Sequence, residues 1–173
     1  MKKLVCIPIL FVLLSCKDAK VIIKSDPFSG PVIKAFDLKT VLSDSAKIKV
    51  TVETPLQLEY QNGNQEYPKG VTVTFFNQKG EAYTRLTADK GKFTKNQNIY
   101  VVYENVLVRN MQKQEELSTV ELFWNPQKQE IYTNQNVKIV TAKEILYGTG
   151  LTAKQDFMSC KITKPTGKFT VQQ

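Results

Sequence analysis

The residue types that carry most protein chemistry are scarce in this chain. Its 173 residues include no histidine, so the commonest general base, proton shuttle and zinc ligand is absent. Serines and lysines are frequent, but none stands in a pattern that pairs a nucleophile with a base. Gly148-Thr149-Gly150 is too short for a phosphate-binding loop and predicts a turn or bulge. The sequence therefore predicts a protein that is not an enzyme and that holds no metal or cofactor.

Cysteine points to one chemical role, at the start of the chain. Cys160 stands alone in the body of the sequence, so it can form no internal disulfide. Lys2 and Lys3 precede an apolar run from Leu4 to Leu14, which is shorter than the about 20 residues that span a bilayer. A basic start followed by a short apolar run is typical of a secretory signal.

The signal ends in Leu13-Leu14-Ser15-Cys16, which is similar to the lipobox of bacterial lipoproteins. In such signals the cysteine is acylated and becomes the first residue of the mature chain. We therefore predict a signal peptide over residues 1–15 and a lipidation site at Cys16, which anchors the body to a membrane outside the cytoplasm. An uncleaved anchor and an ordinary signal with a chance cysteine are the alternatives.

The body reads as a succession of short β-strands, most clearly between Ser118 and Leu151. Apolar residues alternate with polar ones, as in Val120, Leu122 and Trp124. Turn residues interrupt this alternation at Asn125-Pro126 and at Asn134 to Asn136. The pattern leaves no room for a helix of ordinary length and predicts an antiparallel meander with one buried face.

The same pattern organises the chain from Lys47 to its end. Residues 16–46 are mixed in composition and predict a tether, whose later part adds either an edge strand or irregular cover. Pro55 is expected to break the strand that begins at Lys47, and Asn62-Gly63 predicts a hairpin turn. We therefore expect an all-β domain over residues 47–173.

One strand–turn–strand unit occurs twice. Asn96 to Tyr100 leads to Glu104-Asn105-Val106, and Gln127 to Tyr132 leads to Gln135-Asn136-Val137; the two asparagines, at 105 and 136, lie 31 positions apart. A repeated unit that cannot bury its own apolar face is expected to stack into a continuous sheet.

Charge favours anionic partners. The chain has 24 Lys and Arg against 16 Asp and Glu, a formal charge of +8, and the excess persists once Lys2 and Lys3 are removed. Phosphate-bearing lipids and acidic membranes fit this excess, whereas single-stranded nucleic acid is not expected outside the cytoplasm. The alternative is that alternate strand positions carry lysine for solubility.

The alternating strands would leave a large apolar face in water if the sheet stayed open. Such a face is covered by a second layer of the same sheet or by a ligand. A dry core and a V-shaped open sandwich that holds acyl chains require the same sequence pattern, so both readings stay open on the pattern alone.

The order of these features resembles the LptC family, membrane-anchored periplasmic components of lipopolysaccharide export. The resemblance covers roughly Lys47 to Lys164. Its most specific parts are Glu130-Ile131-Tyr132-Thr133-Asn134-Gln135-Asn136-Val137 and the later Gly148-x-Gly150-Leu151, preceded by Asp89-x-Gly91 and Asn105-Val106. The well-known members carry a transmembrane helix, whereas this chain offers a lipobox.

The resemblance implies a twisted antiparallel β-jellyroll, open along one side, that holds the acyl chains of lipid A without catalysis. The residues expected to line its groove alternate along the predicted strands. They are Val71, Val73, Phe75, Ile99, Val101, Val137, Ile139, Met158 and Ile162.

The resemblance also implies partners and a location. Lipopolysaccharide would arrive from an inner-membrane ABC transporter and leave to a periplasmic bridge protein of similar fold, which docks by strand addition. The expected docking edge is the strand from Phe157 to Thr163, through Phe157, Ser159, Lys161 and Thr163. We expect the periplasm, with a lipid anchor in the inner membrane and sorting to the outer membrane as the alternative. The other hypotheses are a structural lipoprotein that scaffolds an envelope complex and a glycan-binding or glycan-modifying surface lipoprotein.

Overall fold

A computed structural model describes residues 28–155, 157 and 159–166, and every regular element among them is a β-strand. The predicted signal peptide and Cys16 lie outside these residues. The strands are β1 (Ile33–Asp44), β2 (Lys47–Glu59), β3 (Gln65–Tyr67), β4 (Val71–Phe76), β5 (Ala82–Ala88), β6 (Lys90–Thr94), β7 (Ile99–Asn110), β8 (Glu115–Asn125), β9 (Glu130–Val140), β10 (Ile145–Lys154) and β11 (Cys160–Thr166).

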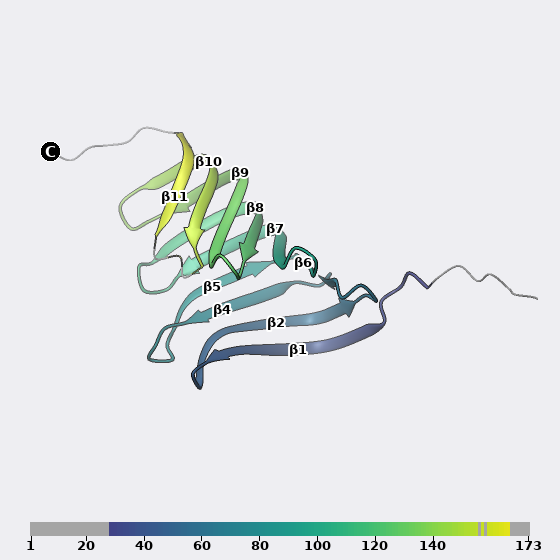
Figure 1. Ribbon diagram of the computed structural model, residues 1–173. Coiled ribbons are helices and arrows are strands. Elements are labelled where there is room, and N and C mark those ends of the chain that lie inside the picture. The colour runs from purple at the N-terminus through teal and green to yellow at the C-terminus, as the bar shows by residue number, and fades with distance from the viewer. Residues whose placement is uncertain (1–27, 156, 158, 167–173) are drawn as a thin grey trace, which may run out of the picture.

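All strand pairings are antiparallel and join the strands into one sheet. The short strands β3 and β4 both pair with β2, and β5 and β6 both pair with β7. Each of these couples therefore acts as one long strand that is interrupted in the middle. The sheet is thus a meander of long strands, with β1 at one end and β11 at the other (Figure 1).

Every strand from β1 to β10 bends or breaks at the same level, and we call this line the crease. Strands β7 to β10 change register there, and β3/β4 and β5/β6 are interrupted there. The residues of the crease are Asp37, Pro55, Gly70, Asp89, Glu104, Asn105, Val120, Glu121, Asn134, Gln135, Thr149 and Gly150. Because bulges bend a strand, a row of them lets the whole sheet fold along one line.

Left-handed backbone conformations produce several of these bends. Glu104 and Asn105 have φ values of 64° and 51°, Asp37 has 48° and Gly150 has 78°. Asparagine and aspartate tolerate this region better than most residues, and glycine adopts it without strain. The Gly148-Thr149-Gly150 segment is accordingly a bulge inside β10, which confirms one of its two predicted roles.

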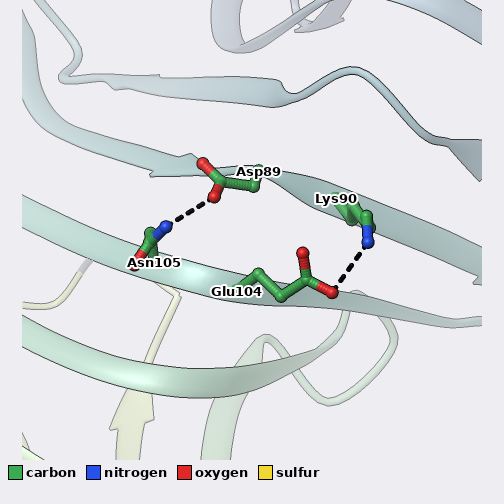
Figure 2. A network of polar contacts seen from close by, with 4 residues as sticks. All are labelled: Asp89, Lys90, Glu104 and Asn105. Carbon is green, nitrogen blue, oxygen red and sulfur yellow. Dashed lines mark hydrogen bonds and ion pairs between the residues drawn. The ribbon is translucent and has the colours of Figure 1, made fainter.

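Side-chain contacts connect neighbouring strands where the bulges interrupt the main-chain ladder. Figure 2 shows Asn105 Nδ2 donating to Asp89 Oδ2 at 2.5 Å, and Lys90 Nζ bonding Glu104 Oε1 at 2.8 Å beside it. The main chain adds the amide of Asp89, which donates to the carbonyl of Glu104 at 2.9 Å. This cluster spans β5/β6 and β7 on the outer side of the crease, where Asp89, Glu104 and Asn105 are all exposed.

Elsewhere along the crease, threonine hydroxyls form hydrogen bonds with main-chain groups. Thr119 Oγ1 donates to the carbonyl of Asn136 at 2.9 Å, and Thr54 Oγ1 donates to that of Gly70 at 2.8 Å. Thr133 Oγ1 accepts the amide of Gln135 at 3.1 Å. All three threonines are buried, where an unpaired main-chain group would be costly.

The all-β fold class is confirmed, but the strands are longer than the sequence indicated. The expected turn at Asn134 to Asn136 is wrong, because these residues bulge within β9 and the strand continues to Val140. The expected break at Pro55 is also wrong, because β2 runs through it to Glu59. Proline lacks an amide hydrogen, and it lies at the crease opposite Asp37, where the pairing bends. The turns at Asn62-Gly63 and Asn125-Pro126 are confirmed.

The sheet begins before Lys47. Strand β1 pairs with β2 along almost its full length, in the region where we expected an edge strand or irregular cover. It leaves apolar side chains in solvent, and Phe36 is 69% exposed. The β-sheet thus includes residues from Ile33 onward, which the predicted tether over residues 16–46 had contained.

Aromatic contacts join strands that are not neighbours in the sheet. Phe75 of β4 meets Trp124 of β8 edge-on, with ring centroids 6.2 Å apart, although β5 and β7 separate these strands in the sheet. Phe75 also meets Phe157, which lies between β10 and β11, at 6.3 Å. The sheet must therefore fold back over itself, and Figure 1 shows β7 to β11 running at a steep angle to β1, β2, β4 and β5.

Replacing Asn105 by alanine is expected to destabilise the crease. The substitution removes the side-chain hydrogen bond to Asp89. It also places alanine at a φ of 51°, which alanine tolerates less well than asparagine. Together these effects should lower the unfolding free energy by about 1–2 kcal/mol. Urea unfolding measures the change.

Asn105→Gly is the matched control, because it removes the same hydrogen bond but accepts the positive φ. It should lose less than half as much stability as Asn105→Ala. Equal losses in the two variants would show that the backbone conformation of Asn105 contributes nothing.

Candidate functional site

The inner face of the folded sheet forms one apolar cluster that draws on almost every strand. Its buried side chains come from both layers, with Leu122, Ile131 and Leu151 on one and Val73 and Phe75 on the other. Burying this many aliphatic and aromatic groups is the main force that holds the layers together.

A small cavity lies inside this cluster. It has a volume of about 40 Å³, and its walls are almost wholly apolar. Its lining residues are Val52, Tyr67, Val71, Val73, Phe75, Leu86, Lys92, Tyr100, Val101, Val102, Leu122, Trp124 and Ile131. Since one water molecule takes about 30 Å³ in the liquid, the space as it stands is far too small for an acyl chain.

A row of stacked aromatic rings crosses three strands beside this cavity. Phe93 stacks on Tyr100 with centroids 4.4 Å apart, and Tyr100 stacks on Trp124 at 5.1 Å. These rings are half-buried, so they form the boundary between the interior and the solvent. Burial raises the pKa of Tyr100 and, together with the neighbouring Tyr100 and Glu59, raises that of Tyr67 well above its ordinary value. Both hydroxyls therefore stay neutral and add no charge to the interior.

Eight of the nine residues expected to line the groove are among the described residues, and they fall into four groups. Val71, Val73 and Phe75 are buried and border the cavity. Val137 and Ile139 are buried in the cluster but lie away from the cavity. Ile162 is partly buried and packs against the cluster, pairing with Leu151. Met158 lies outside the described residues, and Ile99 and Val101 form the fourth group.

Ile99 and Val101 lie outside the buried cluster. Val102 pairs with the buried Leu122, and both pack in the cluster, whereas Val101 pairs with Phe123. The ring of Phe123 stacks on Tyr132 at 5.1 Å, away from the cluster. Val101 still borders the cavity, but it is not part of the buried cluster.

The residues of the expected docking edge lie partly on β11 and partly before it. Strand β11 begins at Cys160, so Phe157 and Ser159 precede it. Phe157 is 8% exposed with its ring against Phe75, and it therefore belongs to the core rather than to an edge. Lys161 and Thr163 do lie on β11, which among the described strands pairs with β10 alone.

The aromatic residues Tyr67, Tyr100 and Trp124 are the interior residues that the sequence analysis missed. A usable signal existed, since Trp124 is the single tryptophan of the chain and occupies an inward position next to a turn. Its partner across the strand pair is Tyr100, a pairing that depends on the register. Register is set by bulges, which alternation along one strand does not reveal.

Other chemistry finds no support among the described residues. No group of three or more histidine, cysteine or carboxylate side chains is placed to hold a metal ion there. Within residues 28–155, 157 and 159–166, no helix has the length and apolar character to cross a bilayer. Cys160 is exposed at the start of β11, and desolvation raises the pKa of its thiol, which disfavours the reactive thiolate.

The bulge in β8 gives a direct test of the inner face. Leu122→Ala should lower the unfolding free energy by about 2–5 kcal/mol, because the side chain is 2% exposed and its removal leaves a hole in the cluster. Chemical denaturation with an unchanged m-value would give this difference.

Val120→Ala on the same strand is the control. Simple alternation groups Val120 with Leu122, but Val120 is 61% exposed and its truncation should change stability by no more than about 0.5 kcal/mol. Comparable losses at both positions would contradict the register that places the bulge between them.

Comparison with known families supplies an independent finding. The family model described as LptC, lipopolysaccharide-assembly, LptC-related, matches residues 35–161. The matched segment begins within β1, takes in β2 to β10 completely and ends within β11. A search of curated proteins finds no match.

Proposed function

Because the chain belongs to the LptC-related family of lipopolysaccharide-assembly proteins, we propose that it is a non-enzymatic carrier in lipopolysaccharide export. In this proposal the creased sheet shields the acyl chains of lipid A between its layers. The lipid arrives from an inner-membrane ABC transporter and passes to a periplasmic bridge protein of similar fold. Transport is passive at this protein, since ATP hydrolysis by the transporter drives the flow.

The observation that carries the proposal is the apolar interior bounded by half-buried aromatic rings. Acyl chains require a surface free of polar groups, and the cavity walls meet this requirement. Phe93, Tyr100 and Trp124 are partly accessible and continuous with that interior, so they supply an apolar path into it.

The small volume sets a condition on the proposal. Since about 40 Å³ cannot hold an acyl chain, the two layers must separate when lipid enters. The contacts of Phe75 with Trp124 and Phe157 join the layers and have to part. Replacing protein–protein contacts by protein–acyl contacts keeps apolar surface out of water, which limits the free energy that opening requires.

Among the described strands, β1 pairs only with β2 and β11 only with β10, and these edges support docking of partners. Strand β11 presents main-chain groups that a strand of the bridge protein can extend, with Lys161 and Thr163 on the docking edge. At the other end, β1 exposes Ile33, Phe36 and Val41. Long apolar edges are an aggregation hazard unless something covers them, so β1 suits a second partner.

The proposed location of the protein is inferred from the predicted signal peptide. Acylated Cys16 would anchor the protein, and we propose the periplasmic face of the inner membrane, where lipid extraction occurs. The residues between Cys16 and β1 would then form the tether.

A structural envelope lipoprotein with a dry core is the second candidate, and the volume of the cavity favours it. A sheet whose layers never part would scaffold a complex through β1 and β11 and would carry no lipid.

Photo-crosslinking distinguishes the two candidates. Benzoylphenylalanine at Trp124 should form an adduct with lipopolysaccharide in cells that make it, because this position faces the interior. Phe123 is the matched control, being the adjacent aromatic residue on the opposite face, and should give an adduct at least about tenfold weaker. The adduct is detected by immunoblotting for lipopolysaccharide.

Adducts of equal strength at Trp124 and Phe123 would indicate non-specific contact with the membrane and would rule out the proposed carrier function. The absence of adducts at both positions, in protein that folds normally, would favour the scaffold.

A further inference from the structure

A second hollow lies beside the apolar interior, and its character is the opposite. It is an open cleft of about 710 Å³ between the ends of β2, β4 and β5 and the turns that follow β8 and β10. Lys49, Lys128 and Lys154 line it, together with side-chain amides such as those of Gln112 and Gln129. We call it the cationic cleft. Its volume lies within the range of small-molecule sites.

The three lysines come from parts of the sequence that only folding brings together. Lys49 belongs to β2 in one layer, while Lys128 and Lys154 lie at the ends of β8 to β10 in the other. None of the three forms an ion pair with any described residue, although four such pairs occur elsewhere in the sheet. Their charges are therefore not neutralised within the described part of the protein.

Acidic groups close to the cleft are engaged elsewhere or line a different hollow. Glu81 accepts a hydrogen bond from Asn77 Nδ2 at 2.9 Å and is not among the residues that line the cleft. Glu130 pairs with Lys154 across β9 and β10, forms no ion pair with it, and lines the adjoining hollow, to which Lys128 and Lys154 also contribute. Among described residues, the lining of the cleft thus offers ammonium and amide donors without a carboxylate.

One wall separates this cleft from the apolar interior. Trp124 Nε1 donates to Gln155 Oε1 at 3.2 Å; Trp124 borders the interior cavity and Gln155 the cleft. Phe75 and Phe76 divide in the same way between the two spaces. An amphiphile with its tail against Trp124 would therefore place its head group close to the three lysines.

We propose that the cationic cleft binds a phosphate group on the head of the carried lipid. The inference rests on the proposed carrier function and adds the chemistry that selects the lipid. Phosphate oxygens are strong acceptors that ammonium groups bind as point charges, and neutral amides supply further donors. The cleft thus recognises phosphorylated amphiphiles over neutral ones with the same acyl chains.

Binding of the full chain to detergent-dispersed lipid A tests this proposal. The probes are bisphosphorylated lipid A and its dephosphorylated form, and the variant is the triple substitution Lys49→Gln, Lys128→Gln and Lys154→Gln. We expect the variant to bind bisphosphorylated lipid A at least about tenfold more weakly, with a shallower salt dependence, and to bind the dephosphorylated form as the wild type does.

The matched control removes three exposed lysines that do not line the cleft, through Lys69→Gln, Lys138→Gln and Lys143→Gln. It has the same net charge as the test variant and should keep wild-type affinity. An equal loss in both triple variants would reduce the effect to overall charge and overturn the site. Unaltered affinity in the test variant would overturn it as well.

Three further outcomes distinguish failure of the phosphate site from failure of the carrier function. Inorganic phosphate could saturate the cleft at low millimolar concentration while the protein shows no preference for phosphorylated lipid. The cleft would then be a site for free anions, and the proposal that it binds a lipid head group would be overturned. A wild-type chain that binds neither lipid would contradict the carrier function itself. Binding of both lipids with equal affinity would agree with the carrier function and overturn only the proposed phosphate site.

Discussion

Main-chain hydrogen bonding at the crease is the constraint on which the rest of the structure depends. A sheet with one apolar face must fold over to cover it, and folding interrupts the ladder of hydrogen bonds along one line. The protein satisfies the interrupted groups with Thr54, Thr119 and Thr133 on the buried side. The pair Asp89 and Asn105 adds a bond on the exposed side. The sheet can thus bend sharply without losing its continuity from β1 to β11.

The bend also explains why the interior can be both packed and adaptable. Within each layer the strands are joined by hydrogen bonds, whereas across the fold we find side-chain contacts such as Phe75 with Trp124. Apolar contacts are non-directional, so one set can be exchanged for another at a small change in free energy, while a ladder of hydrogen bonds cannot. In the proposed carrier function, the layers would therefore part by exchanging side-chain contacts for contacts with lipid, while the hydrogen-bonded ladders stay intact.

The excess of lysine takes on two roles once the chain is folded. Some lysines pair with carboxylates across neighbouring strands, as Lys39 does with Glu53 at 2.8 Å, and the side-chain hydrogen bond to Lys39 lowers the pKa of that carboxyl. Others, including Lys49 and Lys154, gather at the cationic cleft without an acidic partner among the described residues. The sequence alone offered solubility and anion binding as competing readings, and our proposal connects only the lysines of the cationic cleft with anion binding.

The sequence by itself determined the all-β class, the repeated unit and most of the turns, because alternation and Asn, Gly and Pro are local signals. The repeat is meaningful in the structure, since Asn105 and Asn136 both lie at the crease region of their strands. Tertiary structure alone decided which side chains point inward. A bulge shifts a strand by one residue, so Val120 is exposed while Leu122 is buried, and Val102 rather than Val101 joins the core. Likewise, Phe157 reads as part of an edge strand, but the fold places it against Phe75 of a distant strand. Inward orientation depends on where neighbouring strands bend together, and no single strand carries that information.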